Sequence, residues 1–315
     1  MPKIINKIEK EYDGFLTNGE VVYFKRKNYP GKKEFPAGIY QIHRDMSGEM
    51  FFKNMSSMTD DLVELPSFVG STIISEIEQF WSEDVKSRYA KYGMVYKRGI
   101  LLWGLPGTGK TSIVSKVIEK EVNNGSIVFF CPSPSLLTEA VDIIRSIEKQ
   151  ERRILVIFEE LDKLLERDEG SFLSLLDGEM QIQNVLYIAT TNYLDRIPPR
   201  IRNRPSRFAL VIEVPTPDAN ARREFLKAKV KDEIDVEYWV RQTEGFTIDH
   251  IKDLIISVLC IGIKFEDAIL KARQMMEAHL DAENDEYDPY EDSEDDEDPY
   301  GFQKSMLNKF RKKRK

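Results

Sequence analysis

The glycine-rich stretch 104–111, about a third of the way along the chain, has the residue types and spacing of a phosphate-binding loop. It follows a short apolar run, 100–103, and precedes a helical pattern over 112–122, so it joins a predicted strand to a predicted helix. Glycines let successive backbone N–H groups point at a polyphosphate, and the helix N-terminus adds partial positive charge. The residues predicted to bind the nucleotide are Gly104, Leu105, Pro106, Gly107, Thr108, Gly109, Lys110, Thr111 and Ser112.

Two side chains of this loop have predicted chemical roles. Lys110 would reach the β- and γ-phosphates, and the Thr111 hydroxyl would ligate Mg²⁺. The alternative is a glycine-rich turn that binds nothing, which the flanking strand and helix disfavour.

An acidic pair ends the run 154–158, which is so apolar that it predicts a strand covered on both faces. Glu159 would hold Mg²⁺, usually through a bound water. Glu160 would orient or deprotonate the water that attacks the γ-phosphate. The assignment of the two roles stays open, and a charged strand end without a role is the alternative.

Polar residues also follow the next predicted strand, 185–189. The amide of Asn192 could hold the attacking water or the γ-phosphate. Further along, Arg204 and Arg207 are spaced three residues apart. They are either a solvated pair or a source of positive charge for the nucleotide of a neighbouring subunit.

The elements that must position these residues follow from the pattern of the whole chain. Strands alternate with helices over 66–214, which predicts an α/β core with a parallel sheet covered by helices. Short β-branched and aromatic runs between turn signals predict a small, antiparallel, β-rich N-terminal domain over 1–65. Residues 215–280 predict a helical lid, and 281–315 predict a disordered tail.

Charge and composition limit the class of protein. The chain has 315 residues, 41% of them hydrophobic, which is enough for at least one full core. Its net charge of −8 is uneven, because residues 281–300 carry 12 acidic side chains and no basic one, whereas 301–315 carry 7 basic and no acidic one. The nearly balanced remainder excludes a polycation built for nucleic acid. The tail has three interpretations. It is a solvated extension, a docking segment for partners or phosphate backbones, or a self-associating pair of oppositely charged blocks.

The remaining signals concern compartment and metals. Cys131 and Cys260 lie far apart, without CxxC spacing, and predict reduced, buried residues of a cytoplasmic protein. The longest apolar run, 254–263, is too short to cross a bilayer, and the N-terminus lacks a signal-peptide core. Three scattered histidines disfavour a transition-metal site.

The basic and aromatic stretch from Tyr23 to Tyr29 has two interpretations. It could stack single-stranded nucleic acid on its rings. An exposed hairpin edge protected by lysines explains the same residues and is the favoured interpretation.

Taken together, segments 104–111, 159–162, 190–192 and 204–208 resemble, in order and spacing, those of AAA-family ATPases. The resemblance covers residues 66–280. In segments 96–102 and 175–178, and in Glu159, it is closest to the mitochondrial translocase and complex III assembly chaperone of the Rieske iron–sulfur protein. The transmembrane segment of that branch is not found in this sequence, so its specific function is not carried over.

The resemblance implies ATP as the nucleotide, Mg²⁺ as the metal and a homo-oligomeric ring, either a hexamer or a heptamer. By position, Glu159 stands on the metal side, Glu160 at the catalytic position and Asn192 at the sensor position. Arg204 and Arg207 match the arginine fingers that act on a neighbouring subunit's γ-phosphate.

Three departures from the family pattern bear on function. Glu159 replaces the usual aspartate, segment 246–249 replaces a small-residue sensor motif in the lid, and segment 131–137 lacks the aromatic residue and the glycine of loops that thread unfolded chains. We expect Phe129 and Phe130 to pack in the core instead.

The sequence therefore predicts a ring-forming ATPase that couples Mg·ATP hydrolysis to the remodelling of a protein or nucleoprotein partner. One alternative is a loader or motor on nucleic acid that uses the stretch from Tyr23 to Tyr29 and the basic C-terminal end. The other is an ATP-gated scaffold with negligible hydrolysis.

Overall fold

A computed structural model describes residues 12–26, 31–55, 68–131, 133–148, 152–230 and 234–285, without the side chains of Phe68 and of 277–285. Residues 1–11, 27–30 and 286–315 lie outside the described residues, and with them part of the basic and aromatic stretch and most of the predicted tail. The chain forms two units, 1–262 and 263–315.

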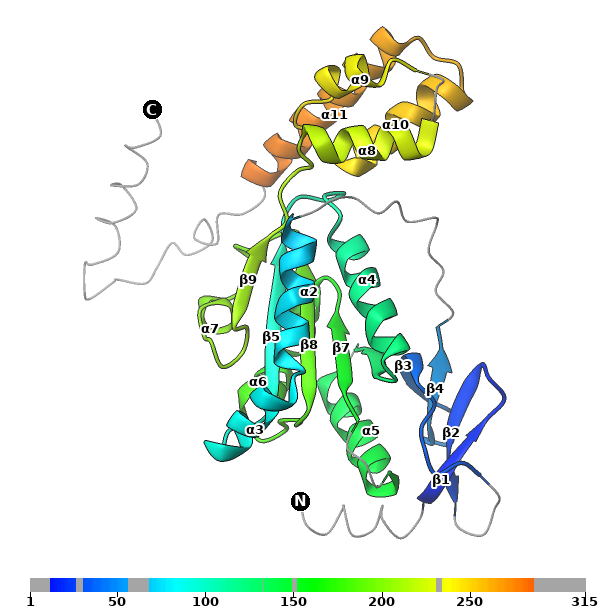
Figure 1. The fold of residues 1–315 in the computed structure, drawn as a ribbon, viewed down its shortest axis with the longest axis vertical. Coiled ribbons are helices and arrows are strands. Elements are labelled where there is room, and N and C mark those ends of the chain that lie inside the picture. The colour runs from blue at the N-terminus through cyan, green and yellow to red at the C-terminus, as the bar shows by residue number, and fades with distance from the viewer. Residues whose placement is uncertain are drawn as a thin grey trace, which may run out of the picture. The chain divides into compact units, whose positions relative to one another are not determined.

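The first unit is built on one nine-stranded sheet (Figure 1) with the order β1-β2-β4-β3-β6-β7-β8-β5-β9. Strands β6, β7, β8, β5 and β9 are parallel, and β3 joins them by pairing parallel with β6. The strands span Tyr12–Thr17 (β1), Val21–Arg26 (β2), Gly38–Arg44 (β3), Met50–Asn54 (β4), Lys97–Trp103 (β5), Ile127–Phe130 (β6), Ile154–Phe158 (β7), Val185–Thr191 (β8) and Leu210–Glu213 (β9).

Helices cover both faces of the parallel strands, as the sequence predicts. Along β7 the side chains alternate between two hydrophobic clusters, Ile154 and Val156 on one face and Leu155 and Ile157 on the other. Helices α2 (Phe68–Phe80) and α4 (Lys110–Asn123) supply one cluster, while α5 (Pro134–Ile147) and α6 (Leu161–Asp177) supply the other. A strand between two apolar layers needs apolar residues at every position, which explains its unbroken run.

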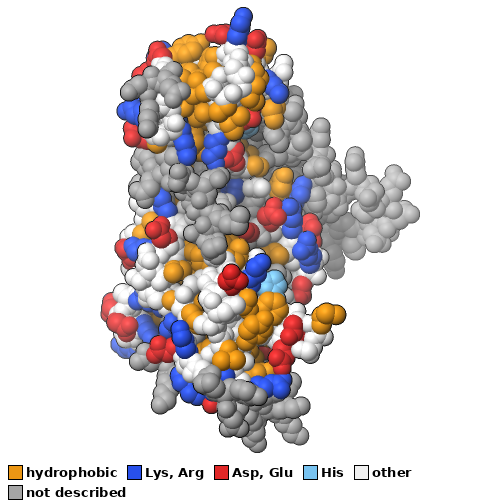
Figure 2. All heavy atoms as spheres, turned by 90° about the vertical axis from the view of Figure 1, so that its right-hand side faces the viewer, with side chains coloured by type: hydrophobic (Ala, Val, Ile, Leu, Met, Phe, Trp, Pro, Cys, Tyr) orange, Lys and Arg blue, Asp and Glu red, His pale blue; other side chains and the backbone are white. Residues whose placement is uncertain are grey.

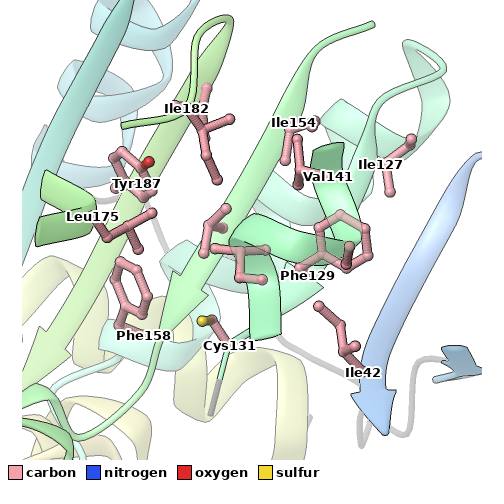
Figure 3. Packing of buried hydrophobic residues seen from close by; sticks show 14 of the residues in the cluster. Ile42, Ile127, Phe129, Cys131, Val141, Ile154, Phe158, Leu175, Ile182 and Tyr187 are labelled. Carbon is pink, nitrogen blue, oxygen red and sulfur yellow. The ribbon is translucent and has the colours of Figure 1, made fainter. Parts of the chain in front are cut away.

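The four N-terminal strands are antiparallel to one another, as predicted, but they continue the core sheet and do not stand apart from it. Their inner side chains share one hydrophobic cluster with the core, where Ile42 of β3 lies near Phe129 of β6 (Figure 3). Phe35, Tyr40 and Phe52 pack in the same cluster. Residues 12–54 are therefore joined to the α/β core by both main-chain pairing and side-chain burial.

Three elements have no counterpart in the prediction: β1, α6 and the short α7 (Pro199–Arg202). The mixed polarity of α6 hides its period, and its backbone is kinked at Asp168, where φ is −156° and ψ is 63°. Helix α3 (Glu83–Lys91) follows α2, and its N-cap Ser82 accepts a hydrogen bond from the N–H of Val85.

The predicted lid begins with α8 (Ala219–Val230), α9 (Val236–Gln242) and α10 (Ile248–Ile255). A π-helical turn, Ile256–Cys260, extends α10. In the second unit, α11 (Phe265–Asp285) continues five residues beyond the predicted start of the disordered tail. None of the helices in the described part of the chain is both long and apolar enough to span a bilayer.

Candidate nucleotide-binding and hydrolysis site

The predicted phosphate-binding loop connects β5 to α4, as its sequence context requires. Gly109 has a φ of 101° and stands at the N-cap of α4, where no side chain caps the helix. The first N–H groups of α4 are thus left for another acceptor. The Lys110 ammonium lies in the loop and donates hydrogen bonds to the carbonyls of Gly104 (2.6 Å) and Leu105 (2.9 Å).

Two other glycines of the loop are required by their surroundings. A Cβ on Gly104 would lie 2.4 Å from the carbonyl oxygen of Val214, which follows β9. Gly107 has a φ of 75°, and a Cβ there would lie 2.8 Å from the Thr247 hydroxyl and from Asp249. The N–H of Ile248 also donates to the Gly107 carbonyl at 2.9 Å. The start of α10 therefore touches the loop directly.

These features fit a bound polyphosphate. The loop supplies an uncapped helix N-terminus, glycines in conformations that other residues avoid, and a lysine whose ammonium is inside the loop. Thr111 is the second residue of α4 and is exposed, so its hydroxyl is accessible to a metal beside the phosphates. Among the described residues no group of three or more His, Cys, Asp or Glu side chains could hold a metal ion. Mg²⁺ in nucleotide sites usually takes one or two protein ligands plus phosphate oxygens and water.

The acidic pair follows β7 at the same edge of the sheet. Glu160 is in the left-handed region (φ 49°) at the N-cap of α6, and its carboxylate pairs with Lys163 at 2.9 Å. A non-glycine residue in this conformation is uncommon. Glu159 is exposed by its accessible surface, yet desolvation by the protein around it, followed by the neighbouring charge of Glu160, raises the pKa of its carboxyl above the ordinary value.

Strand β8 brings the polar triplet 190–192 between the loop and the acidic pair. In the parallel register Phe158 of β7 lies beside Ala189, and Trp103 of β5 lies beside Thr191. Gly104 and Asn192 thus leave adjacent strands at the same level. The carboxyl ends of parallel strands form the usual binding edge of an open α/β sheet.

A buried hydrogen bond supports this edge. Thr191 donates its hydroxyl proton to Asp162 of α6 at 2.6 Å, and the same oxygen accepts the N–H of Tyr193 at 3.0 Å. Thr191 and Asp162 are both buried. This hydrogen bond connects the segment around Asn192 to α6, the helix whose N-cap is Glu160.

The two arginines lie elsewhere and differ from each other. Arg207 is buried and forms a two-pronged ion pair with Asp177 at the end of α6. Arg204 is exposed, and its guanidinium is 3.6 Å from the same carboxylate. The Arg207 carbonyl would lie 2.0 Å from a Cβ on Gly99, near the start of β5. Gly99 and Gly104 are separated by about 16 Å of extended strand, so these arginines are remote from the loop of their own chain.

A polar cavity of about 410 Å³ lies at the other edge of the sheet and is separate from the loop. It is bordered by residues that precede β7 and β8 and by the ends of α2 and α4, among them Trp81, Asn124, Arg153 and Asn184.

Comparison with known proteins agrees with this geometry. Residues 100–216 match the family described as "ATPase family associated with various cellular activities (AAA)". The matched segment is thus similar to this family of ATPases. The match begins in β5 and ends just after β9, so it contains the loop, the acidic pair, Asn192 and both arginines.

The chain is also similar to archaeal proteins. It is 28% identical over 238 residues to the proteasome-activating nucleotidase of Saccharolobus solfataricus, an alignment covering 65% of this chain and 60% of the relative. It is 31% identical over 225 residues to a Cell division cycle protein 48 homologue of Archaeoglobus fulgidus, covering 61% of this chain and 30% of the relative. The chain therefore spans less than two thirds of either relative.

The matched family and the helix-covered parallel strands confirm the predicted α/β fold. By its description, the matched family consists of ATPases. These matches give no support to the narrower resemblance to the Rieske translocase branch, because both relatives carry other names.

The sequence did not indicate the roles of Asp162, Asp177 and Thr191. Asp177 is 30 residues from Arg207 and Thr191 is 29 residues from Asp162, so no local spacing connects them. The only signal was the position of both aspartates in segments that resemble the family.

Proposed function

We propose that this chain hydrolyses ATP as part of a homo-oligomeric ring and uses the reaction to remodel a protein or nucleoprotein partner. The observation that carries the proposal is the convergence of three segments at one sheet edge: the loop after β5, the acidic pair after β7 and Asn192 after β8. Their separation in sequence is large, and the parallel register brings them together.

In this proposal each side chain acts on the triphosphate of ATP. The N–H groups at the start of α4 and the Lys110 ammonium bind the phosphates. Thr111 and Glu159 would hold Mg²⁺, which neutralises charge on the phosphate oxygens. Glu160 aligns the attacking water and accepts its proton as the water oxygen bonds to the γ-phosphorus. The bond from the γ-phosphorus to the β,γ-bridging oxygen breaks at the same time, and ADP leaves. Asn192 orients that water or the γ-phosphate.

The position of Arg204 supports the proposed ring. Its segment lies beside the start of β5, and about 16 Å of strand separates this point from the loop. An exposed arginine at that place serves the site of a neighbouring copy better than its own. A positive charge supplied in this way accelerates phosphoryl transfer by about 10³- to 10⁵-fold. Arg207 would hold the segment in place through Asp177.

The class of partner is inferred from the relatives and from one departure from the family pattern, the missing aromatic residue and glycine in segment 131–137. The nucleotidase is named for activating the proteasome, which favours a protein as the object of the work. Phe129 is fully buried and Phe130 is half-buried against the core. Neither ring is therefore placed to contact an unfolded chain from a pore loop. We therefore propose remodelling without threading by an aromatic loop.

Mixing two inactive variants tests the shared site. Glu160→Gln should lose hydrolysis while keeping Arg204, and Arg204→Ala should keep its own Glu160 while failing to serve its neighbour. Each alone should release phosphate slowly, and their mixture should recover part of the wild-type rate, because some Arg204→Ala sites then face an intact arginine. A mixture no faster than its components would contradict the shared site.

The scaffold alternative makes a different prediction. It requires ATP-dependent assembly of the wild-type chain with no phosphate release at any protein concentration. Measuring assembly by light scattering beside phosphate release separates the two functions.

A further inference from the structure

The outer face of the N-terminal strands carries a row of large side chains in register. Leu16 of β1 lies opposite Tyr23 of β2, Tyr23 opposite Phe51 of β4, and Phe51 opposite His43 of β3. Because side chains alternate along a strand, the neighbours of this row point into the core, where Phe52 is fully buried. The row thus belongs to the other face of the same four strands.

Three of these side chains are rings in contact. The centroids of Tyr23 and Phe51 are 5.6 Å apart, and those of Phe51 and His43 are 5.3 Å apart with planes only 22° from parallel. Tyr23 is 43% exposed and Leu16 is 42% exposed. Figure 2 shows hydrophobic side chains gathered beside a histidine on the side of the molecule where these strands lie. Within the described residues, Phe51 is the ring partner of both Tyr23 and His43.

The adjacent row is polar and includes a cation. Lys53 of β4 lies between Val21 of β2 and Gln41 of β3. In the part of the chain that the structure describes, the exposed Lys53 ammonium has neither an ion pair nor a hydrogen bond. Residues 12–55 carry seven Lys and Arg against five Asp and Glu, although the whole chain has a net charge of −8.

We propose that this face of β1, β2, β4 and β3 binds single-stranded nucleic acid, with bases stacked on Tyr23, Phe51 and His43 and a phosphate held by Lys53. Aromatic rings on an open antiparallel sheet are a recurrent platform for unpaired bases, because every base has a π-face. A lysine and an amide in the next row supply contacts to phosphate and to base edges. A purely apolar partner would leave Lys53 without a counter-charge at the centre of its interface. The inference goes beyond the proposed ATPase and does not depend on it.

The test is fluorescence anisotropy of labelled oligo(dT) and oligo(rU) with the full chain, without nucleotide, over a series of salt concentrations. We expect binding that weakens as salt rises. Tyr23→Leu and Phe51→Leu keep apolar bulk but remove the ring, and each should lower affinity by about 5- to 150-fold. Lys53→Ala should lower affinity and reduce the salt slope by about one. Tyr92→Ala, at a tyrosine that is 66% exposed on another surface, is the matched control and should bind like the wild type.

Several outcomes would overturn the proposal. One is no binding by the wild type at low salt. Another is leucine variants that bind as tightly as Tyr92→Ala. Binding that disappears on removal of residues 301–315 but survives both leucine variants would assign it to the basic end instead. Self-association that the leucine variants abolish, without oligonucleotide binding, would make the face an interface between copies. Phosphate release by the same variants should equal that of the wild type, so failure of this inference is distinguishable from failure of the ATPase proposal.

Discussion

Arg207 and Asp177 form a two-pronged ion pair within one chain. The Arg207 Nε lies 2.8 Å from Oδ2 of Asp177, and a terminal nitrogen lies 3.0 Å from Oδ1. A further N–H of Arg207 donates to the Arg200 carbonyl. Arg204, three residues earlier, is exposed. The structure therefore separates two arginines that have similar sequence surroundings. Arg207 is buried and holds its segment, whereas Arg204 is exposed and lies 3.6 Å from the same carboxylate.

The first prediction follows from this division. Arg207→Ala leaves a half-buried carboxylate without its main partner and should lower the free energy of unfolding by about 3 kcal/mol. Arg204→Ala should change that free energy by less than about 0.5 kcal/mol while strongly reducing phosphate release. Urea denaturation and phosphate release on the same samples measure both effects. Equal stability losses in the two variants would mean that both arginines are structural.

The second prediction concerns acid. The hydrogen bonds from Arg207 hold the pKa of Asp177 below its ordinary value of 3.8. A carboxyl with a lowered folded-state pKa stabilises the protein above 3.8, and this contribution falls as pH drops toward the folded-state value. Asp177→Asn should therefore cost about 2 kcal/mol at neutral pH, and the difference from wild type should shrink below pH 3.8. Urea denaturation across pH checks this, and a difference that does not change with pH would contradict the assignment.

The third prediction separates the two glutamates. Glu160→Gln removes the group that accepts the proton of the attacking water and should lower kcat by about 10²- to 10⁴-fold without weakening ATP binding. Glu159→Gln should instead raise the Mg²⁺ concentration needed for half-maximal activity, and Glu159→Asp is its conservative control. Magnesium titrations of phosphate release decide between them. The opposite pattern would exchange the two roles.

The fourth prediction uses the contact between the loop and α10. Gly107→Ala forces a side chain into the left-handed region, at a cost of about 1–2 kcal/mol, and places its Cβ 2.8 Å from Thr247 and Asp249. We expect lower stability together with weaker ATP binding, measured by thermal unfolding with and without nucleotide. Gly170→Ala is the control, because a Cβ there meets nothing within 4 Å and the residue lies in α6. Wild-type nucleotide affinity in Gly107→Ala would show that this part of the loop does not depend on its contact with α10.

The fifth prediction concerns the support of Asn192. Thr191→Val leaves the buried Asp162 carboxylate without its hydroxyl donor and should cost about 1–3 kcal/mol in stability, with a lower kcat. Asn192→Ala should lower kcat with little loss of stability, because Asn192 is only partly buried. If Thr191→Val reduced stability but left kcat unchanged, the hydrogen bond would support the fold alone.

The sequence by itself determined the loop, the parallel strands and the acidic pair. These features are local: a strand buried on both faces must be apolar throughout, as in 154–158, and a loop that surrounds phosphates needs glycines at close spacing. Such requirements can be read from neighbouring residues. They place Glu159 and Asn192 directly after strands, and Lys110 at the end of the loop that joins a strand to a helix.

Only the tertiary structure decided which residues work together. The pairing of β3 with β6 joins the N-terminal strands to the core, and the two strands are more than eighty residues apart in the chain. The Asp177–Arg207 ion pair and the Thr191–Asp162 hydrogen bond likewise connect residues 30 and 29 positions apart. The row from Leu16 to His43 exists only when four strands are in register. Long-range pairing depends on how the whole chain packs, and periodicity within one segment does not record it.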